Sequence, residues 1–182
     1  MTMMSTTKVS IKAILKMGVC AALVMAVNLL PVNLANAELA KPDGKVLLIV
    51  AGDVGETNMG AEAHLDRDLL QSIGMKTLRT SNQYEPGVHD FKGVMLKDLL
   101  SFLGATGSTL IATALDGYSI EIPVQDANKF PVILAMEKNG KQMTVREKGP
   151  IWVVYPIDQF EELKDQKYSS RSIWQLKRID VQ

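Results

Sequence analysis

Two dipeptides, Asp116-Gly117 and Asn139-Gly140, place the strongest constraint on how this chain can fold. Each joins two extended runs, as in TLIATALDGYSIEIP, and an Asp-Gly or Asn-Gly pair favours the positive φ angles of a tight hairpin turn. Two further runs, GPIWVVYP and RSIWQLKRIDV, add a proline-bounded apolar strand and a closing strand. In the closing run, Trp174 and Leu176 lie on one face and Ile179 and Val181 on the other, which indicates a bulge or two covered faces. The second half of the chain is therefore predicted to consist of strands joined largely as hairpins.

The first half carries the helical signals. A buried strand is expected over 46–51, followed by a helix in which Leu65, Leu69, Leu70 and Ile73 share one face and Gly74 ends the element. A second short helix follows from the leucines between 96 and 103. We expect five to seven strands and two or three short helices, concentrated in the first half. This is an α+β fold with a mixed, mainly antiparallel sheet and short surrounding helices.

The N-terminal 37 residues have the features of a secretory signal peptide. Three lysines precede an apolar run over 17–30, and Ala35-Asn36-Ala37 supplies the small residues of a cleavage site. The alternative is an uncleaved membrane anchor, but Asn28 and Pro31 leave the apolar run short of the roughly 20 residues that span a bilayer. We therefore predict a cleaved signal over 1–37, one domain over 38–182, a periplasmic location and no membrane insertion after cleavage.

Composition excludes several classes of function for the predicted domain. The segment 1–37 holds three of the 20 basic residues and no acid, so 17 basic and 20 acidic residues remain, a balance that gives no sign of nucleic-acid binding. Cys20 is the only cysteine, so residues 38–182 have no thiol for a disulfide, a nucleophile or a metal. His64 and His89 lack the spacing of a zinc or nucleophile–base motif, and His64 is expected to be a packed or capping side chain. No catalytic residue and no metal ligand is therefore predicted.

Polar and aromatic residues gather instead at the ends of the predicted strands, where a rigid sheet presents binding groups. The stretch MKTLRTSNQYEPG is the densest example: it begins as a strand and is expected to end at a Pro-Gly turn. Its polar residues are either an ordinary solvated loop or the rim of a pocket. The candidates at strand ends are Arg79, Thr80, Asn82, Tyr84, Asp116, Tyr118, Arg146, Lys148, Ser170, Arg171 and Trp174.

The order of five motifs resembles the molybdopterin-binding domain of the sulfite oxidase family, in particular its small, secreted, single-domain members. The motifs are FKGVMLKDLLSFLGA, ALDGYSIEIPVQDA, PVILAMEKNGKQM, GPIWVVYP and SIWQLKRIDV. Together they cover nearly all of the chain after the predicted signal. The resemblance implies the sulfite oxidase type of fold.

The resemblance also implies a change at the metal. Catalytic members hold molybdenum through a cysteine at the end of the strand that corresponds to KTLRTSN, and here Thr80 stands at or near that position. A hard hydroxyl oxygen does not replace a soft thiolate on the metal. The implied protein is a non-catalytic sensor that binds a pterin, with molybdopterin held without a protein thiolate as one form of it and no metal expected. It informs a membrane signalling protein such as a diguanylate cyclase or a histidine kinase. Two alternatives stay open: a molybdopterin-dependent oxidoreductase, and an interaction module that kept the fold without a ligand.

A pterin needs a face for stacking, donors for its ring nitrogens and carbonyl, and an acceptor for its amino group. By resemblance, Trp174 or Tyr118 supplies the face, Arg79 or Arg171 the donors, and Asp116 the carboxylate. The expected site also includes three polar residues, Thr80, Asn82 and Ser170. Arg171 carries the greatest weight because a guanidinium presents paired donors.

Overall fold

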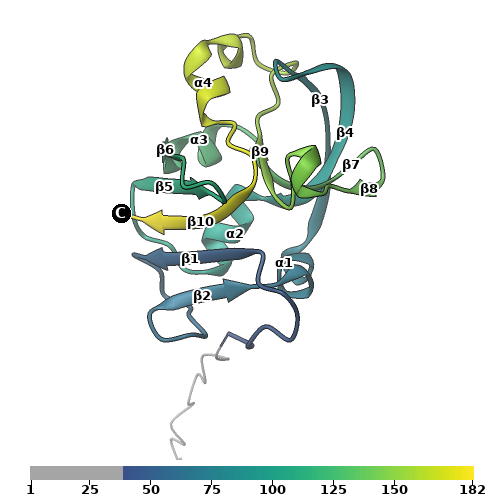
Figure 1. Cartoon of the computed structure of the whole chain (residues 1–182). Helices are drawn as coiled ribbons and strands as arrows, with labels where there is room; N and C mark the ends of the chain where they lie inside the picture. The colour runs from purple at the N-terminus through teal and green to yellow at the C-terminus, as the bar shows by residue number, and fades with distance from the viewer. Residues whose placement is uncertain (1–38) are drawn as a thin grey trace, which may run out of the picture. The chain divides into compact units, whose positions relative to one another are not determined.

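The computed structural model describes residues 39–182, and the predicted signal peptide and its cleavage site lie outside the described residues. The first of two sheets, sheet A, has the strand order β2-β1-β10-β5-β6 (Figure 1). Only β1 and β10 run parallel, and the other neighbours are antiparallel. In chain order its strands are β1 (Leu48–Gly52), β2 (Glu62–Leu65), β5 (Thr109–Ala114), β6 (Ser119–Pro123) and β10 (Leu176–Val181).

The second sheet, sheet B, is antiparallel throughout. Its order is β3-β4-β7-β8, and β9 pairs with β7 as well. Its strands are β3 (Met75–Asn82), β4 (Glu85–Met95), β7 (Ile133–Lys138), β8 (Lys141–Gln142) and β9 (Trp152–Val154). The β3–β4 turn of sheet B and the β5–β6 turn of sheet A both lie beside the segment that leads from β9 to β10.

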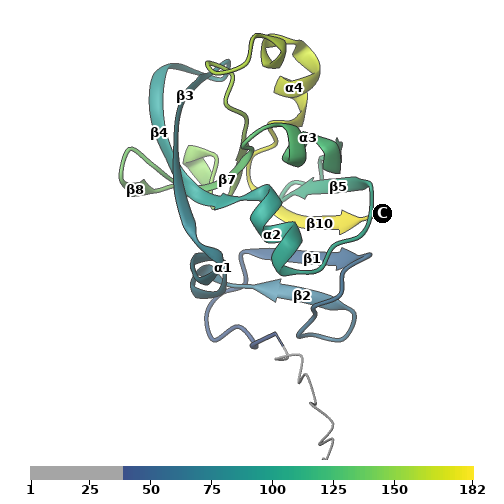
Figure 2. The same ribbon diagram turned by 180° about the vertical axis from the view of Figure 1, so that it is seen from behind.

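Four short α-helices and two 3₁₀ turns complete the described chain. Figure 2 shows α2 in front of β1 and β10, where its leucines enter the main core. Leu96, Leu99 and Leu103 are buried, as the helical spacing predicts. The elements are α1 (Arg67–Ile73), α2 (Leu96–Phe102), α3 (Val124–Lys129), η2 (Val145–Glu147), η3 (Glu161–Lys164) and α4 (Gln166–Arg171). The predicted α+β class with mainly antiparallel sheets is confirmed.

The two hairpin dipeptides also fold as predicted. Asp116-Gly117 joins β5 to β6, and Asn139-Gly140 joins β7 to β8, with positive φ at Gly117 and at both residues of the second turn. The β10–β5 register shifts between Leu176 and Arg178, which confirms the expected bulge. Within residues 39–182, no helix has the length and apolar character needed to cross a bilayer.

The predicted element counts are wrong in two respects. The described residues form ten strands rather than five to seven, because β2 and β4 were not expected, and α3 and α4 lie in the second half rather than the first. The helix expected from Leu65 is preceded by strand β2, which contains Leu65 and His64. Asp66 sets this boundary: its Oδ1 accepts a hydrogen bond from Leu69 N at 2.9 Å and caps α1. His64 is not a capping residue, since its Nε2 pairs with Glu62 at 2.8 Å.

Candidate functional site

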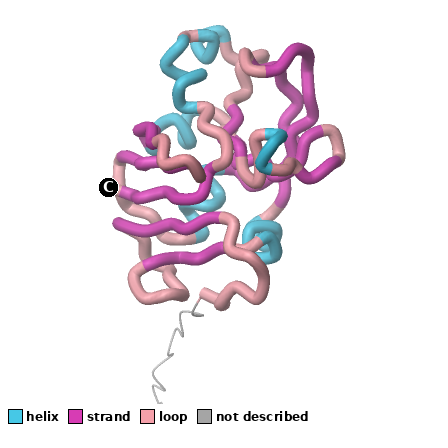
Figure 3. The backbone as a smooth tube through the Cα atoms, in the orientation of Figure 1, coloured by secondary structure: helices cyan, strands magenta, loops and turns pink. Residues whose placement is uncertain are grey.

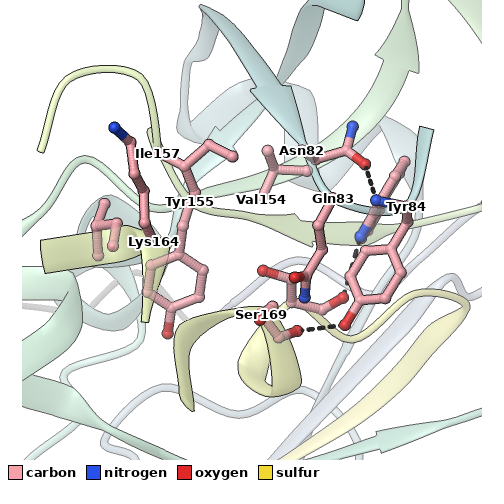
Figure 4. A pocket seen from close by; sticks show the side chains of 11 residues that line it. Asn82, Gln83, Tyr84, Val154, Tyr155, Ile157, Lys164 and Ser169 are labelled. Carbon is pink, nitrogen blue, oxygen red and sulfur yellow. Dashed lines mark hydrogen bonds between the residues drawn. The ribbon is translucent and has the colours of Figure 1, made fainter. Parts of the chain in front are cut away.

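Two adjoining hollows lie between the β3–β4 turn and the segment that carries η3 and α4. This segment consists mainly of helix and loop (Figure 3). The Tyr155 hollow has a volume of about 170 Å³ and the Trp174 hollow about 350 Å³. The first is lined by Asn82, Gln83, Tyr84, Trp152, Val154, Tyr155, Ile157, Leu163, Lys164, Ser169 and Ser172 (Figure 4). The second is lined by Tyr84, Ala114, Asp116, Tyr118, Ser170, Ser172, Ile173 and Trp174. Tyr84 and Ser172 belong to both, so the hollows share a wall.

The β3–β4 turn brings Tyr84 to that wall. The turn falls at Gln83-Tyr84, and Pro86 and Gly87 lie within β4, so the expected Pro-Gly turn is wrong. Asn82 fixes the turn, because its Oδ1 accepts hydrogen bonds from the backbone N of Tyr84 (2.8 Å) and of Glu85 (2.9 Å). This side-chain bond forms the turn without a proline.

Aromatic rings form much of the shared wall. The Tyr84 ring meets Trp174 edge-on at a centroid distance of 4.9 Å and lies 6.5 Å from Trp152. The polar tips are already bonded: Tyr84 OH donates to the Ser169 carbonyl at 2.7 Å, and Trp152 Nε1 donates to the Ser172 carbonyl at 3.1 Å. Trp174 and Tyr118 are 37% and 53% exposed, so their rings are accessible for stacking.

Two polar groups in the hollows have unused hydrogen-bonding capacity. The Asn82 Nδ2 atom is buried and makes no hydrogen bond to another described residue. Its assignment as the nitrogen follows from the two backbone donors that bond the other amide atom. Asp116, at the β5–β6 turn, accepts the Tyr118 backbone N–H with Oδ1 at 3.0 Å and stays exposed in the Trp174 hollow. The walls therefore offer a carboxylate acceptor and aromatic faces, and the unpartnered Asn82 amide nitrogen lies buried beneath the surface of the Tyr155 hollow.

Five of the eight predicted site residues line these hollows. Asp116, Tyr118, Ser170 and Trp174 come together in the Trp174 hollow, and Asn82 lines its neighbour. They come from β3, the β5–β6 turn and the segment before β10, which are distant in sequence. The polar stretch at the end of β3 is thus part of a pocket rim.

Three predicted residues line neither hollow. Arg79 lies on the exposed side of β3 and pairs with Asp90 at 3.0 Å. Thr80 is fully buried; its Oγ1 donates to the Ser81 carbonyl at 3.1 Å and lies 3.4 Å from the Asp158 backbone N, which donates to it. Thr80 is therefore covered by the loop after β9.

Arg171 is committed to a buried carboxylate. Its Nη1 donates to Asp126 Oδ2 at 2.9 Å, and Tyr155 OH donates to the same oxygen at 2.9 Å. Burial, together with the negative charge of Asp126, raises the pKa of Tyr155 far above its usual value, so this hydroxyl stays a donor. The guanidinium also lies 5.5 Å from the Tyr168 ring centroid. Arg171 thus holds α4 to α3 and supports the Tyr155 wall, instead of presenting donors in a hollow.

The wall residues Trp152, Tyr155 and Ser172 were not predicted. Trp152 and Tyr155 sit in the apolar run GPIWVVYP, where sequence gives no sign that their rings border a cavity. Lys148 lies over the Trp152 ring at 5.4 Å and pairs with Glu85 at 3.0 Å. Burial raises the pKa of Glu85, but its bonds to Lys138 and Lys148 outweigh this and hold it below its usual range. The charge of Lys148 is therefore neutralised by Glu85, and Lys148 lines neither hollow.

Comparison with known proteins identifies the family. Residues 64–180 match the family described as the oxidoreductase molybdopterin binding domain. The chain belongs to this family, the sulfite oxidase type of molybdopterin-binding domain, and the resemblance predicted from the five motifs is confirmed.

A solved structure has a similar fold. The sulfane dehydrogenase SoxCD from Paracoccus pantotrophus matches with a TM-score of 0.54 and 18% sequence identity, over 74% of this chain and 37% of that chain. The present chain thus corresponds to little more than a third of that chain, and the likeness concerns the fold. No curated protein matches the sequence.

The described residues do not fit a complete molybdenum cofactor. By the resemblance, Thr80 is the residue expected at or near the position of the metal-binding cysteine, and its hydroxyl is buried beside the Asp158 backbone. Among the described residues that line the two hollows, Lys164 is the only basic one, and it pairs with Glu161 at 2.5 Å, so the phosphate of molybdopterin has no unpaired cation there. The ring of a pterin does fit the donor, acceptor and aromatic faces of the walls.

Proposed function

We propose that this protein is an exported, periplasmic pterin-binding protein that does not itself catalyse a redox reaction and acts as the ligand sensor of a membrane signalling protein. The observation that supports this most is that Trp174 and Asp116 line the same hollow, which has a volume of about 350 Å³. That volume lies at the lower end of the roughly 300–1,000 Å³ of small-molecule sites. The family supplies the link to a pterin.

The chemistry of the walls supports the ring of a pterin as the ligand. A planar heterobicycle stacks on the exposed Trp174 or Tyr118 ring, and its exocyclic amino group donates to Asp116. A ring carbonyl that accepts from Asn82 Nδ2 would satisfy the one amide group of the Tyr155 hollow that has no partner among the described residues. Arg171 and Thr80 act indirectly, as supports of α4 and of β3.

The signalling role is supported by elimination and by the resemblance. Residues 38–182 have no cysteine, and their two histidines lack the spacing of a nucleophile–base motif. The lining residues of the hollows are therefore proposed as binding groups. The partner proposed is the periplasmic domain of an inner-membrane diguanylate cyclase or histidine kinase.

The decisive experiment is cofactor analysis of the protein purified from its own cells. We expect a released fluorescent pterin at close to one per chain, and no molybdenum by elemental analysis. Stoichiometric molybdenum would instead identify an oxidoreductase. Neither metal nor pterin, together with no binding of added hydroxymethylpterin, would identify an interaction module. Lumazine, which carries a carbonyl where a pterin carries the amino group, is the matched control and should bind more weakly because it has no exocyclic amino group to donate to Asp116.

A further inference from the structure

A separate groove of about 580 Å³ opens where the segments that lead into β1 and β10 diverge. The parallel pairing of these strands begins at Ile49 and Arg178. The chain just before β1 follows β2 instead, with Leu47 N donating to the Leu65 carbonyl at 2.8 Å, while Leu176 N donates to the Ile151 carbonyl at 3.0 Å. The two segments of the chain therefore diverge, and the groove lies between them.

The groove is apolar inside and basic at its rim. Its apolar walls include Leu115 and Val145, which are 45% and 50% exposed. Its charged lining residues are Lys45, Lys177 and Arg178, and none is acidic. This concentration of positive charge occurs in a domain that has more acidic than basic residues.

Two of these cations are unpaired. Arg178 is neutralised, because its guanidinium bonds Glu62 and Asp180 at 2.7 Å. Lys45 and Lys177, in contrast, form no ion pair with another described residue. Exposed apolar surface rimmed by polar groups marks interaction sites, and unpaired lysines select an acidic occupant.

The apolar walls and the basic rim suit an extended occupant. The rim carries the unpaired Lys45 and Lys177. Side chains of an extended peptide point alternately to opposite sides, so one set can enter the apolar groove while the other meets the lysines. We propose that this groove binds an extended segment of a partner protein in which acidic and apolar residues alternate.

The groove borders the Trp174 hollow through one strip of chain. Leu115 lines the groove and Asp116, its neighbour, lines the hollow. Leu115 N donates to the Gln175 carbonyl at 2.9 Å, directly after Trp174. A segment bound in the groove therefore contacts the strip that also carries two ligand-facing residues, although its binding does not depend on a pterin.

The test uses a short peptide that alternates glutamate with valine, titrated into methyl-labelled protein and followed by NMR. Two peptides serve as controls: one alternates lysine with valine, the other glutamate with serine. We expect the acidic, apolar peptide to shift the methyl signals of Leu115 and Val145 and to leave Leu163, in the Tyr155 hollow, unchanged. Charge reversal at both lysines, Lys45→Glu with Lys177→Glu, should weaken its binding at least about tenfold.

The matched control carries Lys76→Glu with Lys141→Glu, two exposed lysines that line neither the groove nor the two hollows. It changes the net charge equally and should bind the peptide like the wild type, and both variants should keep the melting temperature. Three results would overturn the proposal: no shift at about 1 mM peptide, the weak end of the affinity scale; equal loss of binding in both variants; or shifts with dodecanoate but not with the peptide, which would assign the groove to a lipid.

Discussion

Trp174 meets Tyr84 edge-on, with ring centroids 4.9 Å apart. Tyr84 belongs to the β3–β4 turn of sheet B, whereas Trp174 directly precedes β10 of sheet A. The contact therefore joins the two sheets at the wall that both hollows share. Since the two side chains are 36% and 37% exposed, they can be altered without opening the core.

Trp174→Ala is therefore a clean test of ligand stacking. We expect pterin affinity to fall about tenfold, close to the roughly 0.5–1.5 kcal/mol of an aromatic pair, while stability falls far less than the roughly 3–5 kcal/mol of a core tryptophan. Phe102→Ala is the matched control, since Phe102 is 39% exposed on α2 and lines neither hollow. Isothermal titration and thermal melts measure the two effects. Equal pterin affinity in all three proteins would remove Trp174 from the site.

Asn82→Asp tests the donor atom of the Asn82 amide while it keeps the acceptor atom. Aspartate keeps an acceptor for the N–H groups of Tyr84 and Glu85, so the turn should persist, whereas its second oxygen replaces a buried nitrogen and should lower the melting temperature. It removes the Nδ2 donor, and pterin affinity should fall by about 1.5–3 kcal/mol because a ligand carbonyl would then face a carboxylate. Asn128→Asp, an exposed change of equal charge in α3, should bind normally. Unchanged binding by Asn82→Asp would show that the free amide group does not contact the ligand.

Arg171→Ala should act on stability. It leaves Asp126, whose side chain is 9% exposed, without its cation, and we expect a loss of about 3 kcal/mol in the free energy of unfolding by urea denaturation. Arg79→Ala breaks an exposed pair, with 70% and 47% of the two side chains accessible, and should cost less than about 1 kcal/mol. In the double variant Arg171→Ala with Asp126→Ala, part of the loss should be recovered. Additive losses would mean that the two residues are not coupled.

Thr80→Cys should yield neither a reactive thiol nor a sulfite oxidase. The position is fully buried beside Asp158, so a thiol there should react with Ellman's reagent only on unfolding. Residues 38–182 hold no other cysteine, and Ser170→Cys, at an exposed position lining the Trp174 hollow, is the reactive control. Rapid labelling at position 80 in the native protein, or sulfite oxidation with bound molybdenum, would show that the site is more open than described.

Acid should loosen the loop after β9. Asp158 accepts hydrogen bonds from the hydroxyl and the backbone N–H of Ser81, at 2.6 and 2.5 Å, and these bonds lower its pKa from the usual 3.8. Because the folded pKa lies below the unfolded one, the stabilisation is complete above about pH 4 and is lost as pH falls through the folded value. Ser81→Ala should raise the Asp158 pKa toward 3.8 in an NMR titration, and Asp158→Asn should flatten this part of the stability profile. An unshifted pKa in Ser81→Ala would contradict the assignment.

Local signals in the sequence were enough to predict the two hairpin turns and helix α2. Asp116-Gly117 determines its own turn, and the hairpin then carries Asp116 and Tyr118 to one strand end, so these candidates could be placed in advance. The position of Trp174 beside them followed from the family resemblance. In contrast, nothing near Arg171 in the sequence announces its partner, because Asp126 lies on α3, and a free arginine and a buried ion pair look alike in sequence.

The burial of Thr80 illustrates the same limit. Leu78 and Thr80 share one side of β3 by simple alternation, so sequence could place the side chain inward. It could not show that Asp158, from the loop after β9, closes over it. The missed wall residues, Trp152 and Tyr155, likewise depend on how η3 and α4 fold back over β9.

The parallel pairing of β1 with β10 has a consequence for how the chain reaches its native state. β10 lies between β1 and β5, so the last of the described strands in chain order fills the middle of sheet A. Contacts between strands far apart in sequence are slow to form, because they must close a long loop. A chain exported as proposed would hold an incomplete sheet A until β10 had crossed the membrane. Removing the six residues of β10 would then take away the centre of the sheet rather than its edge, leaving β1 and β5 without the neighbour that joins them.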